Sequence, residues 1–304
     1  MKIIVLGGGI SPEREVSLRS SAAVKDALIQ AGYKVIYLDP KDGLDALDDL
    51  SAGSIVFPIL HGEGGEDGII QSELEKRNLP YLGTMSAESV ICFDKWQTHE
   101  KLEQAGIPMA QGVIVDKNTY ATHKLAKKPH VLKVLRGGSS IGTYIARDLS
   151  HVGQDDIDKV FSLSNEALIE ELIEGSEITV PIFDDHALPV IEIVPPTDQE
   201  FDYKNKYNGL TQEICPPQSV DGKTQERAQK LAEHVHQTLG ARHFSRIDII
   251  VQNDGDLKVL ELNTIPGMGA QSLYPKSAAE AGMSMPDLVK KFVKLVERDY
   301  GLAK

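Results

Sequence analysis

At the start of the chain, the pattern of hydrophobic and polar residues predicts strands that alternate with helices. Short apolar, β-branched runs predict three strands, at Lys2–Leu6, Lys34–Leu38 and Ser54–Leu60. Between the first two runs, apolar residues recur at helical spacing from Pro12 to Gln30. This order predicts a parallel sheet with helices on its faces, and such sheets bind ligands at the carboxyl ends of their strands. The segments Gly7–Glu15 and His61–Gly68 lie at that edge.

The middle of the chain predicts helices followed by an antiparallel hairpin. Ser86–Ala105 is helical in pattern, and a short strand at Gly112–Val115 follows it. The strands His130–Val134 and Thr143–Ala146 then flank a loop rich in glycine and serine, Arg136–Gly142. Glycines allow backbone amides to wrap around phosphate, so this loop is a candidate phosphate lid.

The last part of the chain mixes strands and helices. Strands are predicted at Ala167–Glu171, Glu177–Phe183, Ala187–Ile193, Arg246–Gln252 and Leu257–Leu262, and helices at Thr224–Leu239 and Met285–Tyr300. The segment Pro195–Pro217 lacks periodicity and predicts a long loop, of a length that is usually functional or disordered. We therefore expect an α/β (α+β) chain with an N-terminal parallel-sheet lobe (residues 1–83), a central lobe (84–170) and a C-terminal lobe (171–304).

Composition narrows the possible partners and the cell compartment. The net charge of -13 argues against a nucleic-acid partner, which would need clustered Lys and Arg. No apolar run approaches the roughly 20 residues that span a bilayer, so we expect no membrane association. The two cysteines, Cys92 and Cys215, are far apart and predict reduced thiols in a cytoplasmic protein.

Oxygen-bearing side chains gather on the last predicted hairpin. Glu261 and Asn263 are two residues apart, so their side chains leave the same strand face, and Asp248 can lie opposite them. Two carboxylates and an amide oxygen suit Mg²⁺. Arg246 shares that face and can stabilise negative charge on a phosphate. A merely solvated strand face shows the same alternation, but the sharp Pro-Gly loop that follows favours a site.

Three motifs occur in order along the whole chain: Glu13-Arg14-Glu15-Val16-Ser17-Leu18, His61-Gly62-x-x-Gly65-Glu66-Asp67-Gly68, and Arg246-Ile247-Asp248 followed by Glu261 through Met268. Together they resemble the ATP-grasp ligases, and among these the D-alanine–D-alanine ligase family. The resemblance implies an ATP-grasp fold whose lobes clamp ATP. It also implies ligation of two D-alanines through a D-alanyl phosphate, for peptidoglycan precursor synthesis.

The resemblance assigns residues to the metal and the nucleotide. Asp248, Glu261 and Asn263 would hold two Mg²⁺ ions, or Mn²⁺, with Glu261 as the bridge. ATP would be bound by Lys95, Lys133, Ser139, Ser140, Glu170, Glu171, Ile173, Glu177 and Lys206. Of these, Lys206 would reach the γ-phosphate from the long loop. Without the resemblance, Lys95 and Lys133 also fit solvated surface lysines.

The resemblance also places the first D-alanine. Glu15 would bind its ammonium group, with His61 nearby. Ser139 and Tyr207 would join Glu15 in a hydrogen-bonded network that closes two loops over the reactants. Without the resemblance, Glu15 also fits an acidic residue of a first helical turn, and His61 fits a capping or core histidine.

The second D-alanine would be held through its carboxylate by Arg246, Ser272 and the amide of Leu273. Tyr207 after Lys206 favours an amine acceptor over D-lactate. A related ligase with D-lactate or another amino acid as acceptor, and an inactive nucleotide-binding regulator, stay open as alternatives. The family also implies a homodimer.

The chain departs from the family pattern at several positions. Val134-Leu135 follows Lys133 where Pro-Ser is usual, and Gly137 stands where an acidic residue is common. His243 stands where a small residue is more usual, and Gln271 where a histidine may precede the serine. The first two differences affect the predicted phosphate lid, and His243 lies just before the strand that carries Arg246.

Overall fold

The N-terminal lobe is built on a three-stranded parallel sheet. We describe a computed structural model that covers residues 2–50, 53–138, 141–149, 153–196 and 210–302. The sheet order is β2 (Lys34–Leu38), β1 (Lys2–Leu6) and β3 (Ile55–Pro58), with helices α1 (Arg14–Gln30) and α2 (Ile69–Lys76) and the 3-10 turns Pro40–Asp42 and Asp45–Leu47. The predicted parallel pairing is confirmed, because Ile4 lies beside both Ile36 and Val56.

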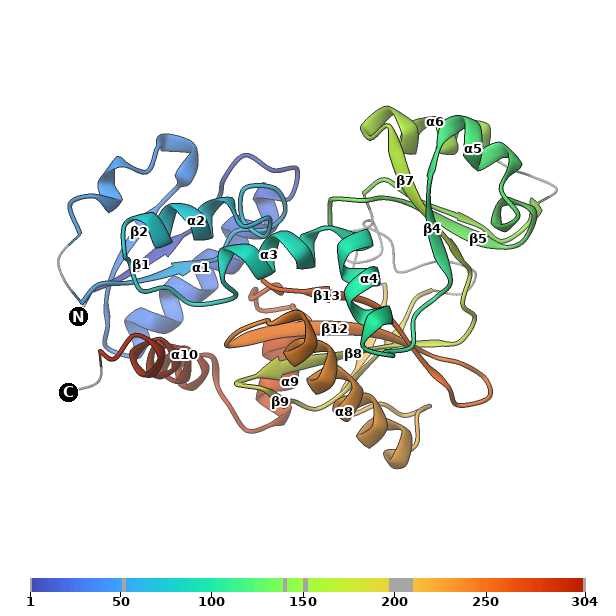
Figure 1. The fold of residues 1–304 in the computed structure, drawn as a ribbon. Coiled ribbons are helices and arrows are strands. Elements are labelled where there is room, and N and C mark those ends of the chain that lie inside the picture. The colour runs from blue at the N-terminus through green and yellow to red at the C-terminus, as the bar shows by residue number, and fades with distance from the viewer. Residues whose placement is uncertain (1, 51–52, 139–140, 150–152, 197–209, 303–304) are drawn as a thin grey trace.

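The C-terminal helix α10 (Met285–Asp299) returns to the N-terminal lobe. Figure 1 shows α10 next to α1, with both chain ends on the same side of the molecule. Phe57 of β3 and Phe292 of α10 make an edge-to-face ring contact with centroids 6.5 Å apart, inside one buried cluster. Burial of apolar surface between the first and the last elements of the chain therefore stabilises the packing of α10 on the N-terminal lobe.

The central lobe is a separate four-stranded antiparallel sheet, at the upper right of Figure 1. Its order is β4 (Gly112–Asp116), β7 (Glu166–Glu171), β5 (His130–Val134) and β6 (Thr143–Ala146). Helices α5 (Lys117–Thr122) and α6 (Gln154–Leu163) and the 3-10 turn Leu125–Lys127 accompany the sheet and share its core. The predicted hairpin is confirmed, because β5 and β6 pair antiparallel across the glycine-rich loop.

The C-terminal lobe contains the largest sheet, which is antiparallel throughout. Its order is β11 (Gln212–Ile214), β10 (Ile191–Val194), β8 (Ser176–Phe183), β12 (Phe244–Val251) and β13 (Leu257–Asn263), and β9 (His186–Ala187) pairs with β8. Helices α8 (Gly222–Leu239) and α9 (Leu273–Glu280) complete the lobe. Helix α3 (Ser86–Phe93) leads into α4 (Lys95–Gln104), whose Leu102 is buried in the same core as α8.

The structure corrects two of the predicted elements. The single strand predicted at Ala187–Ile193 is two strands, β9 and β10, and Pro189 between them cannot donate to a ladder. Strand β11 lies within the segment predicted as a loop, where it forms the sheet edge beside β10. No helix among the described residues is long and apolar enough to cross a membrane.

Candidate active site

One large cleft, with a volume of about 1010 Å³, collects side chains from all three lobes. The predicted site residues among its described lining are His61, Lys95, Lys133, Glu170, Arg246, Glu261, Asn263, Ser272 and Leu273. They come from the loop after β3, from α4, from β5 and β7, from the β12–β13 hairpin and from the start of α9. The fold therefore brings together residues as far apart in the chain as His61 and Leu273.

The β12–β13 pairing places polar side chains on one sheet face. Arg246 lies opposite Asn263, and Asp248 lies opposite Glu261. Residues directly opposite in an antiparallel pair share a face, so the predicted arrangement of these four side chains is confirmed. The register shifts just after Asp248, which leaves Leu260 as an extra residue that also lines the cleft.

Asp248 is engaged by its neighbours on the sheet. Arg246 donates from Nε to Asp248 Oδ1 at 2.9 Å and from Nη2 to Oδ2 at 2.7 Å, and Thr179 Oγ1 donates to Oδ1 at 2.5 Å. Asp248 is buried and does not line the cleft, whereas Glu261 and Asn263 do. Within the described part of the chain, no three His, Cys, Asp or Glu side chains are grouped closely enough to hold a metal.

Two partly buried lysines supply positive charge beside the glycine-rich loop. Lys133 Nζ lies 2.6 Å from Glu170 Oε2, across the paired strands β5 and β7. Burial lowers the pKa of Lys133, but the nearby Glu170 more than offsets this, so the pKa of Lys133 is raised. Lys95 donates to the carbonyl of Gly137 in the loop at 2.7 Å, and burial lowers the pKa of Lys95. Both ammonium groups therefore face the space beside the loop.

The opposite wall belongs to the N-terminal lobe and is tied to the C-terminal lobe through Ser20. Ser20 Oγ lies 3.0 Å from His61 Nε2 and accepts the Met268 N–H at 3.1 Å. Burial, followed by the positive charge of Arg246, lowers the pKa of His61 to about 4. His61 is therefore a neutral imidazole near neutral pH.

Glu13, rather than Glu15, lies in the cleft. Glu13 is buried and lines the cleft, whereas Glu15 is exposed in the first turn of α1 and does not line it. Two residues along a helix turn a side chain by roughly 200°, so the two acids point to opposite sides. A Cβ atom on Gly138 would lie 2.6 Å from Glu13 Oε2, so the glycine-rich loop lies directly against this carboxylate.

Other predicted residues lie elsewhere or outside the described chain. Glu171, Ile173 and Glu177 do not line the cleft. The Glu171 side chain instead accepts the Gln111 N–H at 3.2 Å. The remaining predicted residues, Ser139, Ser140, Lys206 and Tyr207, lie outside the described residues.

Ser272 and Leu273 form the start of helix α9 at the cleft wall. Ser272 is the N-cap, with an extended backbone and no side-chain capping bond. Its hydroxyl is packed close to Gly267, because a Cβ atom on that glycine would lie 2.9 Å from Ser272 Oγ. A helix N-terminus with a hydroxyl beside it favours binding of an anionic group.

Glu66 is a cleft residue to which the sequence assigned no role. It is buried, and its Oε2 accepts the Gly62 N–H at 2.7 Å. Burial, followed by the nearby negative charge of Glu13, raises the pKa of Glu66 from its ordinary 4.5 to about 8. Two buried carboxyl groups therefore face the same part of the cleft, and one of them holds a proton at neutral pH.

The raised pKa of Glu66 predicts a specific pH dependence of stability. Between pH 4.5 and 8 the folded protein holds a proton that the unfolded chain has lost, so stability falls as the pH rises. We expect the unfolding free energy of the wild type, relative to Glu66→Gln, to fall by more than about 1 kcal/mol between pH 5 and pH 8. Urea unfolding without metal or nucleotide measures this difference in free energy.

The exposed neighbour Glu63 supplies the control, Glu63→Gln, whose unfolding free energy should change with pH in parallel with that of the wild type. Parallel curves for Glu66→Gln would contradict the assignment.

Comparison with known proteins agrees with this geometry. A family model described as the D-ala D-ala ligase C-terminus matches residues 102–294. A D-alanine–D-alanine ligase from Actinobacillus succinogenes is 40% identical over 302 residues, which cover 97% of each chain. The crystal structure of the D-alanine–D-alanine ligase from Bacillus anthracis superposes with a TM-score of 0.84 at 30% identity over 99% of each chain. Its complex with ATP superposes with a TM-score of 0.83 at 29% identity, also over 99% of each chain. The expected ATP-grasp fold is thus confirmed, and the chain belongs to the D-alanine–D-alanine ligase family.

Proposed function

We propose that this protein joins two D-alanine molecules to D-alanyl-D-alanine at the expense of ATP, as a step of peptidoglycan precursor synthesis. The observation that carries the proposal is the cleft whose lining includes Glu13, His61, Arg246 and the start of α9. Such a cleft can hold two small zwitterions side by side, because it offers a carboxylate to an ammonium group and a guanidinium to a carboxylate. The homodimer and the cytoplasmic location implied by the family stay predictions.

ATP would lie between the central and C-terminal lobes. Lys95 and Lys133 offer ammonium groups to its phosphates beside the glycine-rich loop, and Glu170 orients Lys133 through their short ion pair. The roles predicted for Lys206, Ser139 and Ser140 stay predictions.

Glu261 and Asn263 supply the oxygen donors for magnesium. Asn263 Oδ1 accepts the Ile265 N–H at 3.0 Å and keeps a second lone pair for a metal. Asp248 would join this donor set by exchanging one of its bonds to Arg246. Bound Mg²⁺ would neutralise charge on the phosphates, which is most of what phosphoryl transfer requires.

The first D-alanine would bind at the wall of the N-terminal lobe. The buried Glu13 carboxylate suits the substrate ammonium, and a bound cation would also relieve the repulsion between Glu13 and Glu66. His61, held by Ser20, would lie beside it. Gly138 of the glycine-rich loop lies against Glu13, so the phosphate lid would lie beside the substrate. The network predicted for Ser139 and Tyr207 stays a prediction, now centred on Glu13.

The second D-alanine would bind at the wall of the C-terminal lobe. The start of α9 offers Ser272 Oγ and the Leu273 amide to its carboxylate, and Arg246 adds a guanidinium. Asp248 accepts two hydrogen bonds from that guanidinium, and the one that remains when Asp248 joins the metal would still orient it.

The reaction would then proceed in two steps. A carboxylate oxygen of the first D-alanine attacks the γ-phosphorus of ATP, and ADP leaves, which gives D-alanyl phosphate. The neutral amine of the second D-alanine attacks the acyl carbon, and inorganic phosphate leaves as the peptide bond forms and the amine loses a proton. Arg246 stabilises the oxyanion of the tetrahedral intermediate. Exclusion of water from the cleft would limit hydrolysis of the acyl phosphate.

Phosphate release from ATP tests the proposed function. We expect release with D-alanine alone, one phosphate for each dipeptide formed, and none with L-alanine. A faster release with D-alanine plus D-lactate, with formation of an ester, would instead identify the D-lactate acceptor type. The absence of any amino-acid-dependent release would identify an inactive nucleotide-binding regulator.

Two acids at the start of α1, Glu13 and Glu15, test which residue binds the first D-alanine: the structure favours Glu13, whereas the sequence suggested Glu15. We expect Glu13→Gln to lower kcat/KM for D-alanine by about 10- to 100-fold, because it removes a charge-assisted hydrogen bond to the ammonium. Glu15→Gln should change this value by less than about twofold, as is usual for exposed substitutions. Initial-rate kinetics at saturating ATP measure both. A larger loss in Glu15→Gln than in Glu13→Gln would contradict the placement of the first subsite.

A further inference from the structure

A strained turn connects the N-terminal lobe to the strand that carries Arg246. His243 has a positive φ of 68°, and the Phe244 N–H donates to the Arg242 carbonyl at 2.8 Å, which closes a three-residue turn around His243. This left-handed conformation favours glycine, so a histidine persists here only if its surroundings hold it.

The His243 ring is held at both nitrogen atoms. The Gly83 N–H donates to His243 Nδ1 at 3.0 Å, which fixes Nδ1 as the acceptor. Nε2 therefore carries the proton and donates to Asp299 Oδ2 at 2.9 Å. The side chain is fully buried, and burial followed by the charge of Arg242 lowers the pKa of His243 to about 4. The neutral ring thus joins three segments: the end of the N-terminal lobe, the start of β12 and the last helix.

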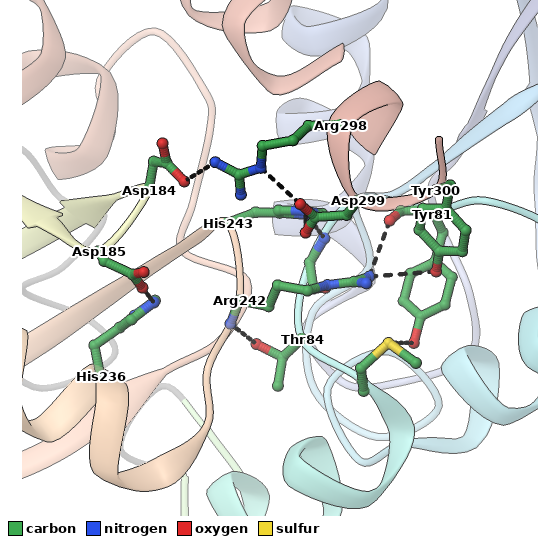
Figure 2. A network of polar contacts seen from close by, with 12 residues as sticks. Tyr81, Thr84, Asp184, Asp185, His236, Arg242, His243, Arg298, Asp299 and Tyr300 are labelled. Atoms are coloured by element: carbon green, nitrogen blue, oxygen red, sulfur yellow. Dashed lines mark hydrogen bonds and ion pairs between the residues drawn. The ribbon is translucent and has the colours of Figure 1, made fainter. Parts of the chain in front are cut away.

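Arg242 holds the other side of the same glycine. Its Nε donates to the Gly83 carbonyl at 2.7 Å, and its Nη2 donates to the Tyr81 carbonyl at 3.1 Å. Figure 2 shows the guanidinium beside the neighbouring rings of Tyr81 and Tyr300, whose centroids lie 5.0 Å and 5.4 Å from Cζ. The N–H and the C=O of Gly83 are therefore both bound by adjacent residues of one turn, which fixes this peptide in position and orientation.

The contacts of Arg242 and His243 with Gly83 fix the position of one wall of the cleft relative to the other. On one side, the segment before Gly83 pairs with β3, because the Leu82 N–H donates to the Val56 carbonyl at 2.9 Å, and β3 leads to His61. On the other side, β12 begins at Phe244 and carries Arg246 into the cleft. A shift at Gly83 would therefore change the distance between His61 and Arg246.

We propose that His243 is a positioning residue for the ligation: by joining Gly83 and Asp299 to the start of β12, it sets the spacing between the subsites of the two D-alanines. This inference rests on the proposed function. The first step needs only ATP and the first D-alanine, whereas the second step needs the amine and the acyl carbon in line. A relaxed spacing therefore affects the second step more, and water then hydrolyses D-alanyl phosphate to D-alanine and inorganic phosphate.

The test is the number of phosphates released for each dipeptide in His243→Gly. Glycine keeps the left-handed turn without strain and removes both ring hydrogen bonds. We expect dipeptide formation to fall at least about fivefold and the phosphate-to-dipeptide ratio to rise from one to about two or more. A loss of folded protein lowers both products equally, so this ratio does not respond to stability alone. A ratio that stays at one in His243→Gly would overturn the proposal.

Two further variants make the result specific. Asn78→Gly is the matched control, because Asn78 is an exposed left-handed residue of the N-terminal lobe, and its ratio should stay at one. Asp299→Ala removes the Nε2 partner of His243, together with the ion pair between Asp299 and Arg298, and should raise the ratio less than His243→Gly does. If His243→Gly does not fold, the proposal stands or falls on a raised ratio in Asp299→Ala.

Hydroxylamine separates this proposal from the proposed function. This small nucleophile captures an acyl phosphate as a hydroxamate without using the second subsite. We expect His243→Gly to form hydroxamate within about twofold of the wild-type rate. A hydroxamate rate that falls in step with dipeptide formation would contradict a role in spacing. If the wild type forms neither hydroxamate nor dipeptide, the proposed function itself fails.

Discussion

The antiparallel pairing of β12 with β13 is the constraint on which the site depends. It places Arg246 beside Asp248 and opposite Asn263, and Asp248 opposite Glu261, so that one sheet face carries the charged groups. A slip of one residue would turn these side chains into the hydrophobic core, where Ile247, Ile249 and Val259 are buried. The same apolar residues that stabilise the C-terminal lobe therefore also fix the register of the polar ones.

The site also depends on a local group of positive charges in a chain whose net charge is negative. The protein is acidic, with a net charge of -13, yet an anionic nucleotide needs cations. The structure provides them as two partly buried lysines and one guanidinium, and two of these three cations lie beside a carboxylate: Lys133 with Glu170, and Arg246 with Asp248. These partners keep the cations charged and oriented despite burial. At the opposite wall, the carboxyls of Glu13 and Glu66 suit a substrate ammonium rather than a phosphate.

Much of the fold could be predicted from the sequence, because its strands are short apolar runs bounded by turns. The hairpin at residues 246–262 followed from alternation and a turn signal, so its cross-strand neighbours were predictable. The sequence could not show whether Glu13 or Glu15 enters the cleft. Both acids lie in one motif, and only the orientation of the start of α1 decides between them. The contacts of Ser20 and His243 could not be predicted either, because their partners, Met268 and Gly83, are distant in sequence. Contacts between lobes leave no periodic signal in the chain.

We propose that the β12–β13 hairpin binds nucleotide through a metal that Glu261 and Asn263 help to hold, and the function of the site depends on this. Isothermal titration with a non-hydrolysable ATP analogue, with and without Mg²⁺, tests it most directly in the wild type and in Glu261→Gln. We expect Mg²⁺ to tighten binding to the wild type by about tenfold or more and to have little effect on the variant. Equal magnesium dependence in the two proteins, or no binding of the analogue to the wild type, would contradict the account.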